Sequence, residues 1–233
     1  MSTVKGGNSI ITDGLVLYLD TANATSYSSN SVNFKNLGST KLTPTIVGSP
    51  TINTTNGSMT LDGTGAQYIE VVADGTTAGF NIQNFTIDCW VNLLNDGSYE
   101  ALWSYDYTSH VTPFYAQHIR TQNSLAQINF IGNSGVNVGK SGIINYGTWQ
   151  NFTFVRSLDN STTSMYLDGQ LEANNTGQNN SIDYYNQEVW IGKANFGTAN
   201  YKGDIGPYKF YNRALTASEI LQNYNATKGR FGI

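Results

Sequence analysis

Short segments with a two-residue hydrophobic period constrain the fold of this chain more than any other feature. The clearest is FTIDCWVNL at residues 85–93, in which every second residue is apolar, as in a half-buried β-strand. Gly- and Asn-containing turns separate the segments, and no helical pattern lies between them. Such spacing predicts an all-β, antiparallel sandwich or barrel. The predicted strands occupy residues 15–20, 58–72 (two strands), 85–93, 100–107, 114–120, 125–132, 149–157, 163–169, 188–194 and 204–212.

Composition limits the partners of the chain. Its 233 residues fit one large all-β domain. Only 12% of them are charged, against about 25% in an average domain, and the net charge is −4. We therefore expect no nucleic acid and no membrane among its partners, because the chain has neither a basic field nor a run of about 18 apolar residues. The predicted surface is polar, uncharged and rich in Tyr, which suits contacts with sugars or proteins.

Cysteine content and the first residues bear on the compartment. The single cysteine, Cys89, excludes an internal disulfide. It lies on the apolar side of its predicted strand, so we expect a buried, unreactive thiol. The start of the chain, MSTVKGGNSI, lacks the apolar core of a signal peptide. We therefore expect synthesis and folding in a cytoplasm.

One helix is predicted, near the end of the chain. Thr216 is the expected N-cap, and Glu219 completes a capping box with it. Leu215 and Ile220 are spaced as a hydrophobic staple around this cap. The helix, over about residues 217–225, is too short to be stable alone, so we expect it to latch across an open end of the sandwich. Its predicted apolar stripe comprises Ile220, Leu221 and Tyr224.

A tight hairpin is predicted at Asp168-Gly169, within YLDGQLEA. Asp and Gly both tolerate the positive φ angles of a type I′ turn. The alternating residues on either side then form two adjacent antiparallel strands.

Catalytic chemistry has few candidate residues. A glycoside hydrolase needs two facing carboxylates, about 5.5 Å apart in retaining enzymes and about 6.5–9.5 Å in inverting ones. Asp88 is the single acid of its strand and Glu100 is isolated. His110 and His118 match neither a structural zinc motif nor a nucleophile motif. We expect a non-enzymatic protein in which Asp88 is a hydrogen-bonded strand residue, with a catalytic acid as the alternative.

Three longer stretches resemble a known family: FTIDCWV, WQNFTFVRSLDNSTTSMYLDGQLEA and VWIGKANFGTANYKGDIGPYKFYNRALTASEILQNYNA. The order and spacing of Trp149, the Tyr166–Gly169 turn, Ile191-Gly192 and the YNRALTASEI ending resemble laminin-G-like, concanavalin A-like lectin/glucanase domains. The resemblance covers residues 15–225 and leaves an N-terminal arm, 1–14, and a C-terminal tail, 226–233. It implies a jelly-roll sandwich of two antiparallel sheets, one of them concave, whose usual roles are glycan binding, protein binding and adhesion.

The same resemblance raises the question of calcium, which many relatives bind through acidic loops. The corresponding stretches here, GTGAQY at 63–68 and GDIGPY at 203–208, lack the acids expected at those points. Asp20, Asp62 and Asp204 lie nearby in sequence and are oxygen donors of the type that calcium prefers. We expect no cofactor, with a structural calcium ion as the alternative.

A narrower resemblance concerns the two ends of the chain. GGNSIITDGLVLYLDTAN and ILQNYNATKGRFGI are similar to the ends of laminin-G-like structural proteins of tailed bacteriophages. This implies a virion protein made in the host bacterial cytoplasm and displayed on the virion surface as a head decoration. The implied partners are the major capsid protein or the tail, and further copies of the chain in a homo-oligomer. The alternative is a tail- or fibre-borne adhesin that binds a host glycan.

Two sets of residues are candidates for these contacts. An aromatic segment supplies the candidate glycan face, with a core or subunit interface as the alternative: Trp103, Tyr105, Tyr107, His110, Tyr115, His118 and Arg120. The arm and the tail supply the candidate assembly contacts, with frayed termini as the alternative: Lys5, Ile10, Lys228, Arg230 and Phe231.

Overall fold

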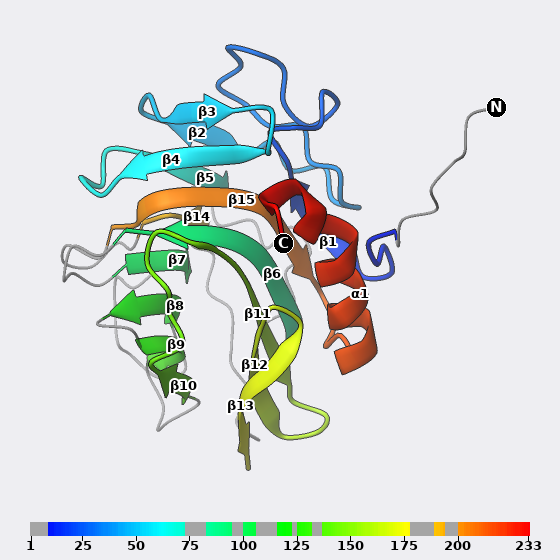
Figure 1. The fold of residues 1–233 in the computed structure, drawn as a ribbon. Helices are drawn as coiled ribbons and strands as arrows, with labels where there is room; N and C mark the ends of the chain where they lie inside the picture. The colour runs from blue at the N-terminus through cyan, green and yellow to red at the C-terminus, as the bar shows by residue number, and fades with distance from the viewer. Residues whose placement is uncertain are drawn as a thin grey trace.

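Two antiparallel sheets pack face to face in the computed structural model of the chain (Figure 1). The structure describes residues 9–72, 83–94, 100–105, 116–122, 125–131, 137–177, 189–193 and 200–233. One short helix lies across the outside of one sheet (Figure 1). The predicted all-β two-sheet sandwich with a single C-terminal helix is confirmed for these residues. None of the helices in the described ranges has the length and apolar character of a transmembrane span.

The first sheet, sheet A, runs in the order β13-β12-β11-β6-β15-β4-β3, and β1 also pairs with β15. Its strands are β1 (Leu15–Leu19), β3 (Thr51–Asn53), β4 (Ser58–Asp62), β6 (Asn84–Leu93), β11 (Trp149–Ser157), β12 (Thr162–Leu167), β13 (Gln170–Thr176) and β15 (Lys202–Tyr211). Sheet B runs in the order β10-β9-β8-β7-β14-β5-β2. Its strands are β2 (Thr45–Val47), β5 (Tyr68–Val72), β7 (Glu100–Tyr105), β8 (Ala116–Gln122), β9 (Leu125–Ile131), β10 (Asn137–Ser141) and β14 (Val189–Ile191).

The core lies between the two sheets and follows the predicted alternation. In β6 the apolar set Phe85, Ile87, Cys89, Val91 and Leu93 is buried and belongs to the main core cluster. Burial raises the pKa of the Cys89 thiol far above its usual value, so the thiolate does not form near neutral pH. The prediction of a buried, unreactive cysteine is confirmed.

The Asp168-Gly169 hairpin is also confirmed. It joins β12 to β13, with φ angles of 49° at Asp168 and 78° at Gly169. Positive φ at both central residues is the type I′ geometry that matches the twist of the flanking strands.

The segment between β1 and β4 is more ordered than its sequence suggested. Residues 21–57 carry many turn signals, yet they contain β2 and β3, which pair with different sheets. The two strands predicted within 58–72 also separate, because β4 joins sheet A and β5 joins sheet B. The turn between them therefore crosses from one sheet to the other.

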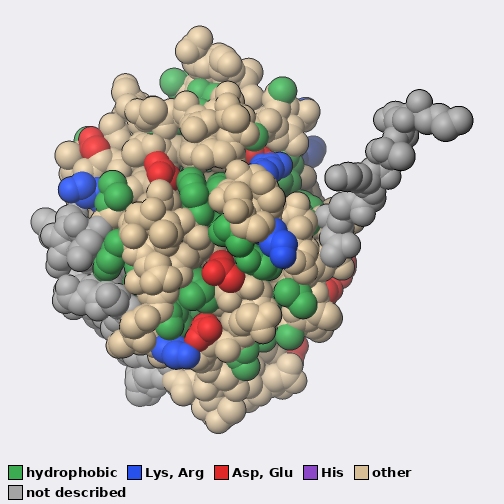
Figure 2. Space-filling view, in the orientation of Figure 1, with side chains coloured by type: hydrophobic (Ala, Val, Ile, Leu, Met, Phe, Trp, Pro, Cys, Tyr) green, Lys and Arg blue, Asp and Glu red, His purple; other side chains and the backbone are tan. Residues whose placement is uncertain are grey.

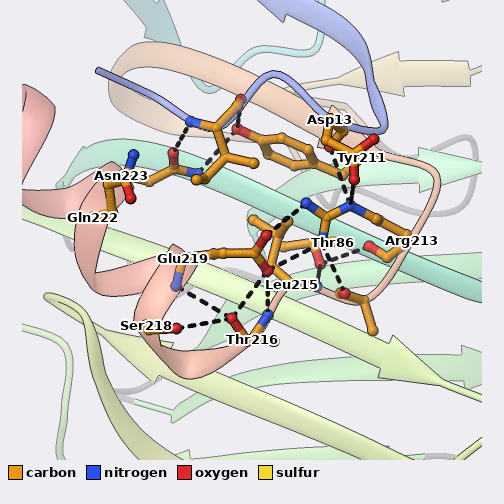
Figure 3. Close-up of polar contacts among 12 residues, drawn as sticks. Asp13, Thr86, Tyr211, Arg213, Leu215, Thr216, Ser218, Glu219, Gln222 and Asn223 are labelled. Atoms are coloured by element: carbon orange, nitrogen blue, oxygen red, sulfur yellow. Dashed lines mark hydrogen bonds and ion pairs between the residues drawn. The ribbon is translucent and has the colours of Figure 1, made fainter. Parts of the chain in front are cut away.

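The C-terminal helix α1 spans Ala217–Thr227 and begins at the predicted capping box. Thr216 Oγ1 accepts a hydrogen bond from the Glu219 backbone, and Glu219 accepts one from the Thr216 backbone (Figure 3). Two ion-paired hydrogen bonds of 2.7 and 3.0 Å join Arg213 to the same Glu219 carboxylate. Leu215 and Ile220 are buried together in a second apolar cluster, so the predicted staple forms.

The buried face of α1 differs from the predicted stripe. Its buried residues are Ile220, Asn223 and Thr227, whereas Leu221 is 38% exposed. The two polar residues among them bond to groups of sheet A beneath, Asn223 to the Asp88 carboxylate and Thr227 to Trp90 Nε1. Asn223 lies between the N-terminal segment and β15, accepting from the Ile11 backbone at 2.9 Å and donating to Tyr211 Oη at 3.0 Å (Figure 3).

A buried polar cluster connects α1 to three strands of sheet A. Lys209 Nζ on β15 lies 3.2 Å from the Asp88 carboxylate on β6, and both side chains are at most 1% exposed. Asn151 on β11 and Asn223 on α1 donate to the two Asp88 oxygens at 2.8 and 2.9 Å. This confirms that Asp88 is a hydrogen-bonded strand residue, because its carboxylate is fully engaged and closed to substrate.

The chain after α1 folds back over the same sheet. A 3₁₀ turn, η1 (Lys228–Phe231), places the Phe231 ring between two tryptophans, with centroids 4.4 Å from both Trp90 and Trp149. Arg230 forms an ion pair of 2.7 Å with Asp20, whose side chain is fully buried. The tail is thus part of the domain's own packing.

Candidate functional site

The predicted glycan face does not form around Trp103. This side chain is 1% exposed, and its ring centroid lies 5.1 Å from Phe210 and 6.0 Å from Tyr208. Both partners belong to β15 in the opposite sheet, so Trp103 is a core residue. A β-bulge between Ala101 and Trp103 interrupts the regular register of β7 at this point. The alternative left open by the sequence, a core position, is correct for Trp103.

The other members of that predicted face are described only in part. Three lie outside the described residues: Tyr107, His110 and Tyr115. Three lie in described strands: Tyr105 at the end of β7, with His118 and Arg120 in β8. The backbone register places His118 opposite Ser104. A ligand-binding role for these six residues stays a prediction.

Most of the predicted assembly contacts have partners within the chain. Ile10 packs against the second apolar cluster, and Lys228 Nζ lies 5.2 Å from the centroid of an aromatic ring on α1. Arg230 and Phe231 bind sheet A and the segment after β1, as described above. Lys5 lies outside the described residues. Contacts of these residues with a neighbouring subunit stay a prediction.

An exposed aromatic group lies on the outer face of sheet B. The rings of Tyr68 on β5 and Trp190 on β14 meet edge to face, with centroids 5.6 Å apart. Lys193, just beyond β14, places its Nζ 4.3 Å from the Tyr68 centroid and 4.9 Å from the Trp190 centroid. All three side chains are partly exposed. Together with Glu70 they form what we call the aromatic patch.

Strand alternation explains how these residues come to the outer face. In β5, Ile69 and Val71 are each 3% exposed and face the core, so Tyr68 and Glu70 face outward. In β14, Trp190 stands between two core residues, Val189 and Ile191. The sequence carries this signal in EVWIGK, where Trp190 stands between two β-branched core residues, and in QYIEVV, where Tyr68 precedes the core residue Ile69. Aromatic density along one segment does not indicate the patch, because Tyr68 and Trp190 lie far apart in the chain.

Polar groups surround the patch. The register aligns Thr45, Glu70, Trp190 and Ser104 in one row across four strands. The Glu70 carboxylate has no hydrogen bond or ion pair with any described residue. Trp190 Nε1 and Ser104 Oγ are buried and also lack a partner among the described residues.

The chemistry of the patch is that of binding. Tyr and Trp present apolar ring faces with polar edges, and the Lys193 ammonium adds a positive charge held by the two rings. Only one member, Glu70, is acidic, whereas glycoside hydrolysis requires a pair of carboxylates. Charged side chains are also sparse on the face of the molecule that Figure 2 shows, where uncharged groups dominate. Flat rings with flanking hydrogen-bonding groups suit a neutral polyhydroxylated ligand.

Of the three acids considered for calcium, Asp62 and Asp204 lie on the paired strands β4 and β15, whereas Asp20 follows β1. Asp20 binds Arg230, and Asp62 accepts from the Thr64 backbone and hydroxyl at 2.9 and 2.8 Å. These hydrogen bonds lower the pKa of Asp62. Asp204 accepts from Thr60 and, at 3.1 Å, from Asn92. No group of three or more His, Cys, Asp or Glu residues that could hold a metal occurs in the described part of the chain.

Sequence comparison identifies one family. The model of the family described as "Concanavalin A-like lectin/glucanases superfamily" matches residues 62–221. No curated protein is similar enough in sequence to count as a match.

Solved structures of similar fold include binding domains of botulinum neurotoxins. The binding domain of botulinum neurotoxin DC in complex with SialylT has a TM-score of 0.69 at 12% identity, over 93% of this chain and 52% of that one. The same toxin domain with rat synaptotagmin II has a TM-score of 0.70 at 12% identity, with the same coverage. Domain 4 of AbnA, a GH43 extracellular arabinanase from Geobacillus stearothermophilus, in complex with arabinotriose, has a TM-score of 0.64 at 16% identity, over 92% and 100%. The chain thus spans about half the length of the toxin domains.

Proposed function

Because the chain belongs to the concanavalin A-like lectin/glucanase superfamily, we propose that it binds carbohydrate at the aromatic patch of sheet B, without catalysis. The observation that carries this proposal is the partly exposed Tyr68–Trp190 pair with Lys193 held over both rings. A structure of similar fold that is a complex with arabinotriose adds support. The proposed ligand is a neutral oligosaccharide whose ring stacks on Trp190 and whose hydroxyls bind Glu70 and Lys193.

A non-catalytic role follows from the acids. Glu70 has no second carboxylate within the patch, and Asp88 is buried beneath α1 with three polar partners. A glycosidase mechanism needs two accessible carboxylates at a fixed separation. The proposal therefore predicts retention of oligosaccharide without the release of new reducing ends.

The test is a glycan array probed with the labelled chain, followed by calorimetry on the best ligand. Trp190→Ala should weaken binding by more than about tenfold, because truncation of a central aromatic anchor commonly costs about 2 kcal/mol or more. Tyr166→Ala is the matched control, since it removes a partly buried aromatic side chain from sheet A. Equal affinities of the wild-type chain and Trp190→Ala would overturn the proposal. Accumulation of reducing ends would overturn its non-catalytic part.

We further propose that the domain is displayed on a bacteriophage virion, as a head decoration. The support is the similarity of the two chain ends to those of laminin-G-like virion proteins. In many copies on one particle, weak glycan contacts add up through effective concentration. A tail or fibre location is the alternative.

Immunogold electron microscopy of purified particles separates these locations. Regular label over the head supports a decoration protein, and label at the tail tip supports an adhesin. Particles without label would refute the virion proposal and leave the carbohydrate proposal standing.

A further inference from the structure

We propose that a hollow in the loops between β1 and β2 is a second binding site, selective for an acidic sugar. The hollow has a volume of about 600 Å³ and is formed by residues 24–43. The loop segment that lines it runs beside β2 and β3 (Figure 1). The volume lies within the range of about 300–1,000 Å³ typical of small-molecule sites. The site is separate from the aromatic patch, and the inference does not depend on that proposal.

The positive charge of the hollow comes from two lysines. Lys35 and Lys41 both line it, both are exposed, and neither side-chain ammonium forms an ion pair or hydrogen bond with a described residue. The described lining contains no acidic residue. In a chain with net charge −4, this gives the hollow a sign opposite to that of the whole molecule. A Lys ammonium binds carboxylate or sulfate through charge-assisted hydrogen bonds.

The remaining lining matches the rest of a sugar. It is rich in hydroxyl and amide side chains, including Thr25, Ser28, Asn33 and Thr43. These groups donate to and accept from sugar hydroxyls, whereas a bare inorganic anion needs far less space. Phe34, 2% exposed, lies at the base with its ring 5.8 Å from Tyr27 and anchors the loop in the core.

The walls of the hollow are held in place by hydrogen bonds within the loop. Asn36 accepts from the Tyr18 backbone at 2.8 Å and donates to the Val16 carbonyl at 2.8 Å, which ties the loop to β1. The Lys35 backbone donates to the Ser26 carbonyl at 2.8 Å and joins the two sides of the hollow. A preformed site of this kind loses less conformational entropy when a ligand binds.

A neighbouring hollow extends the site. It has a volume of about 440 Å³, shares Ser31 with the first, and includes Val32, which is 61% exposed. The second hollow has no charged residue among its described lining. An oligosaccharide can therefore place its acidic residue near the lysines and a neutral residue beyond Ser31.

The experiment is a titration of the full chain with trigalacturonate and with its carboxyl-reduced neutral counterpart, at low and high salt. We expect the acidic probe to bind about tenfold more tightly, with this preference lost at high salt because exposed charges are screened. Lys35→Gln/Lys41→Gln should abolish the preference. The control variant Lys140→Gln/Lys202→Gln removes two positive charges outside the hollow and should retain the preference for the acidic probe. A sulfated trisaccharide as a third probe distinguishes sulfate from carboxylate recognition.

Three outcomes would overturn this inference: no binding of either acidic probe, equal binding of the acidic and neutral probes, or a preference that both double variants reduce alike. Lys35 and Lys41 are exposed, so thermal unfolding of Lys35→Gln/Lys41→Gln should match that of the wild-type chain. Trp190→Ala reports on the aromatic patch alone. Loss of neutral-glycan binding in that variant, with trigalacturonate binding unchanged, shows that the two sites are separate.

Discussion

Lys209 and Asp88 show what a buried charge requires. Each is at most 1% exposed, and removing such groups from water costs several kcal/mol per ion unless both find partners. Here the Asp88 carboxylate accepts hydrogen bonds from two Asn amides and pairs electrostatically with the Lys209 ammonium, which makes no hydrogen bond of its own to a described residue. The cluster joins residues from β6, β11, β15 and α1, so it specifies one position of the helix on the sheet.

Lys209→Ala should lower the free energy of unfolding by about 3–5 kcal/mol, because it leaves a buried carboxylate without its cation. Lys140→Ala, which breaks the pair with Glu172 where the lysine is 46% exposed, should cost less than about 1 kcal/mol. Urea unfolding followed by circular dichroism measures both values. Similar losses in the two variants would contradict the role assigned to the buried pair.

At the scale of the element, α1 depends on its first turn. Ile220 packs the helix against sheet A, and the hydrogen bonds between Thr216 and Glu219 pair backbone N–H groups at its N-terminus. Arg213 holds the Glu219 carboxylate in place for this cap. Hydrogen bonds from the Arg213 guanidinium, followed in size by smaller effects of Thr216, lower the pKa of Glu219 from 4.5 to about 2. The ionised carboxylate is thus favoured in the folded state.

The stability that Glu219 contributes should depend on pH in a defined window. Because its folded pKa lies below the unfolded value of 4.5, the contribution is complete above that pH and is lost as the pH falls toward about 2. Glu219→Gln should therefore show a smaller drop in urea midpoint between pH 6 and pH 2 than the wild-type chain. An identical drop in the two proteins would mean that Glu219 is not linked to folding.

At the scale of the whole molecule, the C-terminal tail closes the outer face of sheet A. Phe231 stacks on Trp90 and Trp149, and Trp90 Nε1 donates to Thr227 at 2.8 Å. Phe231→Ala should destabilise the domain by about 2 kcal/mol, less than a fully buried Phe because the ring is partly exposed. Trp fluorescence should shift to the red as the two indoles meet water.

Ile233→Ala is the matched control for this prediction, since Ile233 is 51% exposed and two residues further along the tail. It should leave both the stability and the fluorescence unchanged. If Phe231→Ala behaves like Ile233→Ala, the tail does not contribute to the closure of sheet A.

Local signals in the sequence predicted the local structure well. The capping box at Thr216, the hairpin at Asp168-Gly169 and the alternation of β6 each depend on residues a few positions apart. The residues of the candidate site depend on contacts between segments that lie far apart in the chain, which local patterns do not predict. Alternation separates two faces of a strand but does not say which one meets the opposite sheet, so the sequence left Trp103 open between the glycan face and the core and did not single out Trp190. The sequence predicted no strand in residues 21–57. Side-chain hydrogen bonds, such as those of Asn36, order that segment, and no local pattern indicates them.

The pairing of β1 with β15 has a mechanical consequence. The two strands are antiparallel neighbours in which Leu15 faces Tyr211, so the chain enters β1 and leaves β15 at the same end of the ladder. Tension applied between the two ends of the chain therefore loads these hydrogen bonds one after another, as in unzipping, instead of all together in shear. The tail and α1 lie in the path of that force before the ladder does. Under load, the domain should yield first at Phe231 and Arg230, then at the helix, and only then along β1.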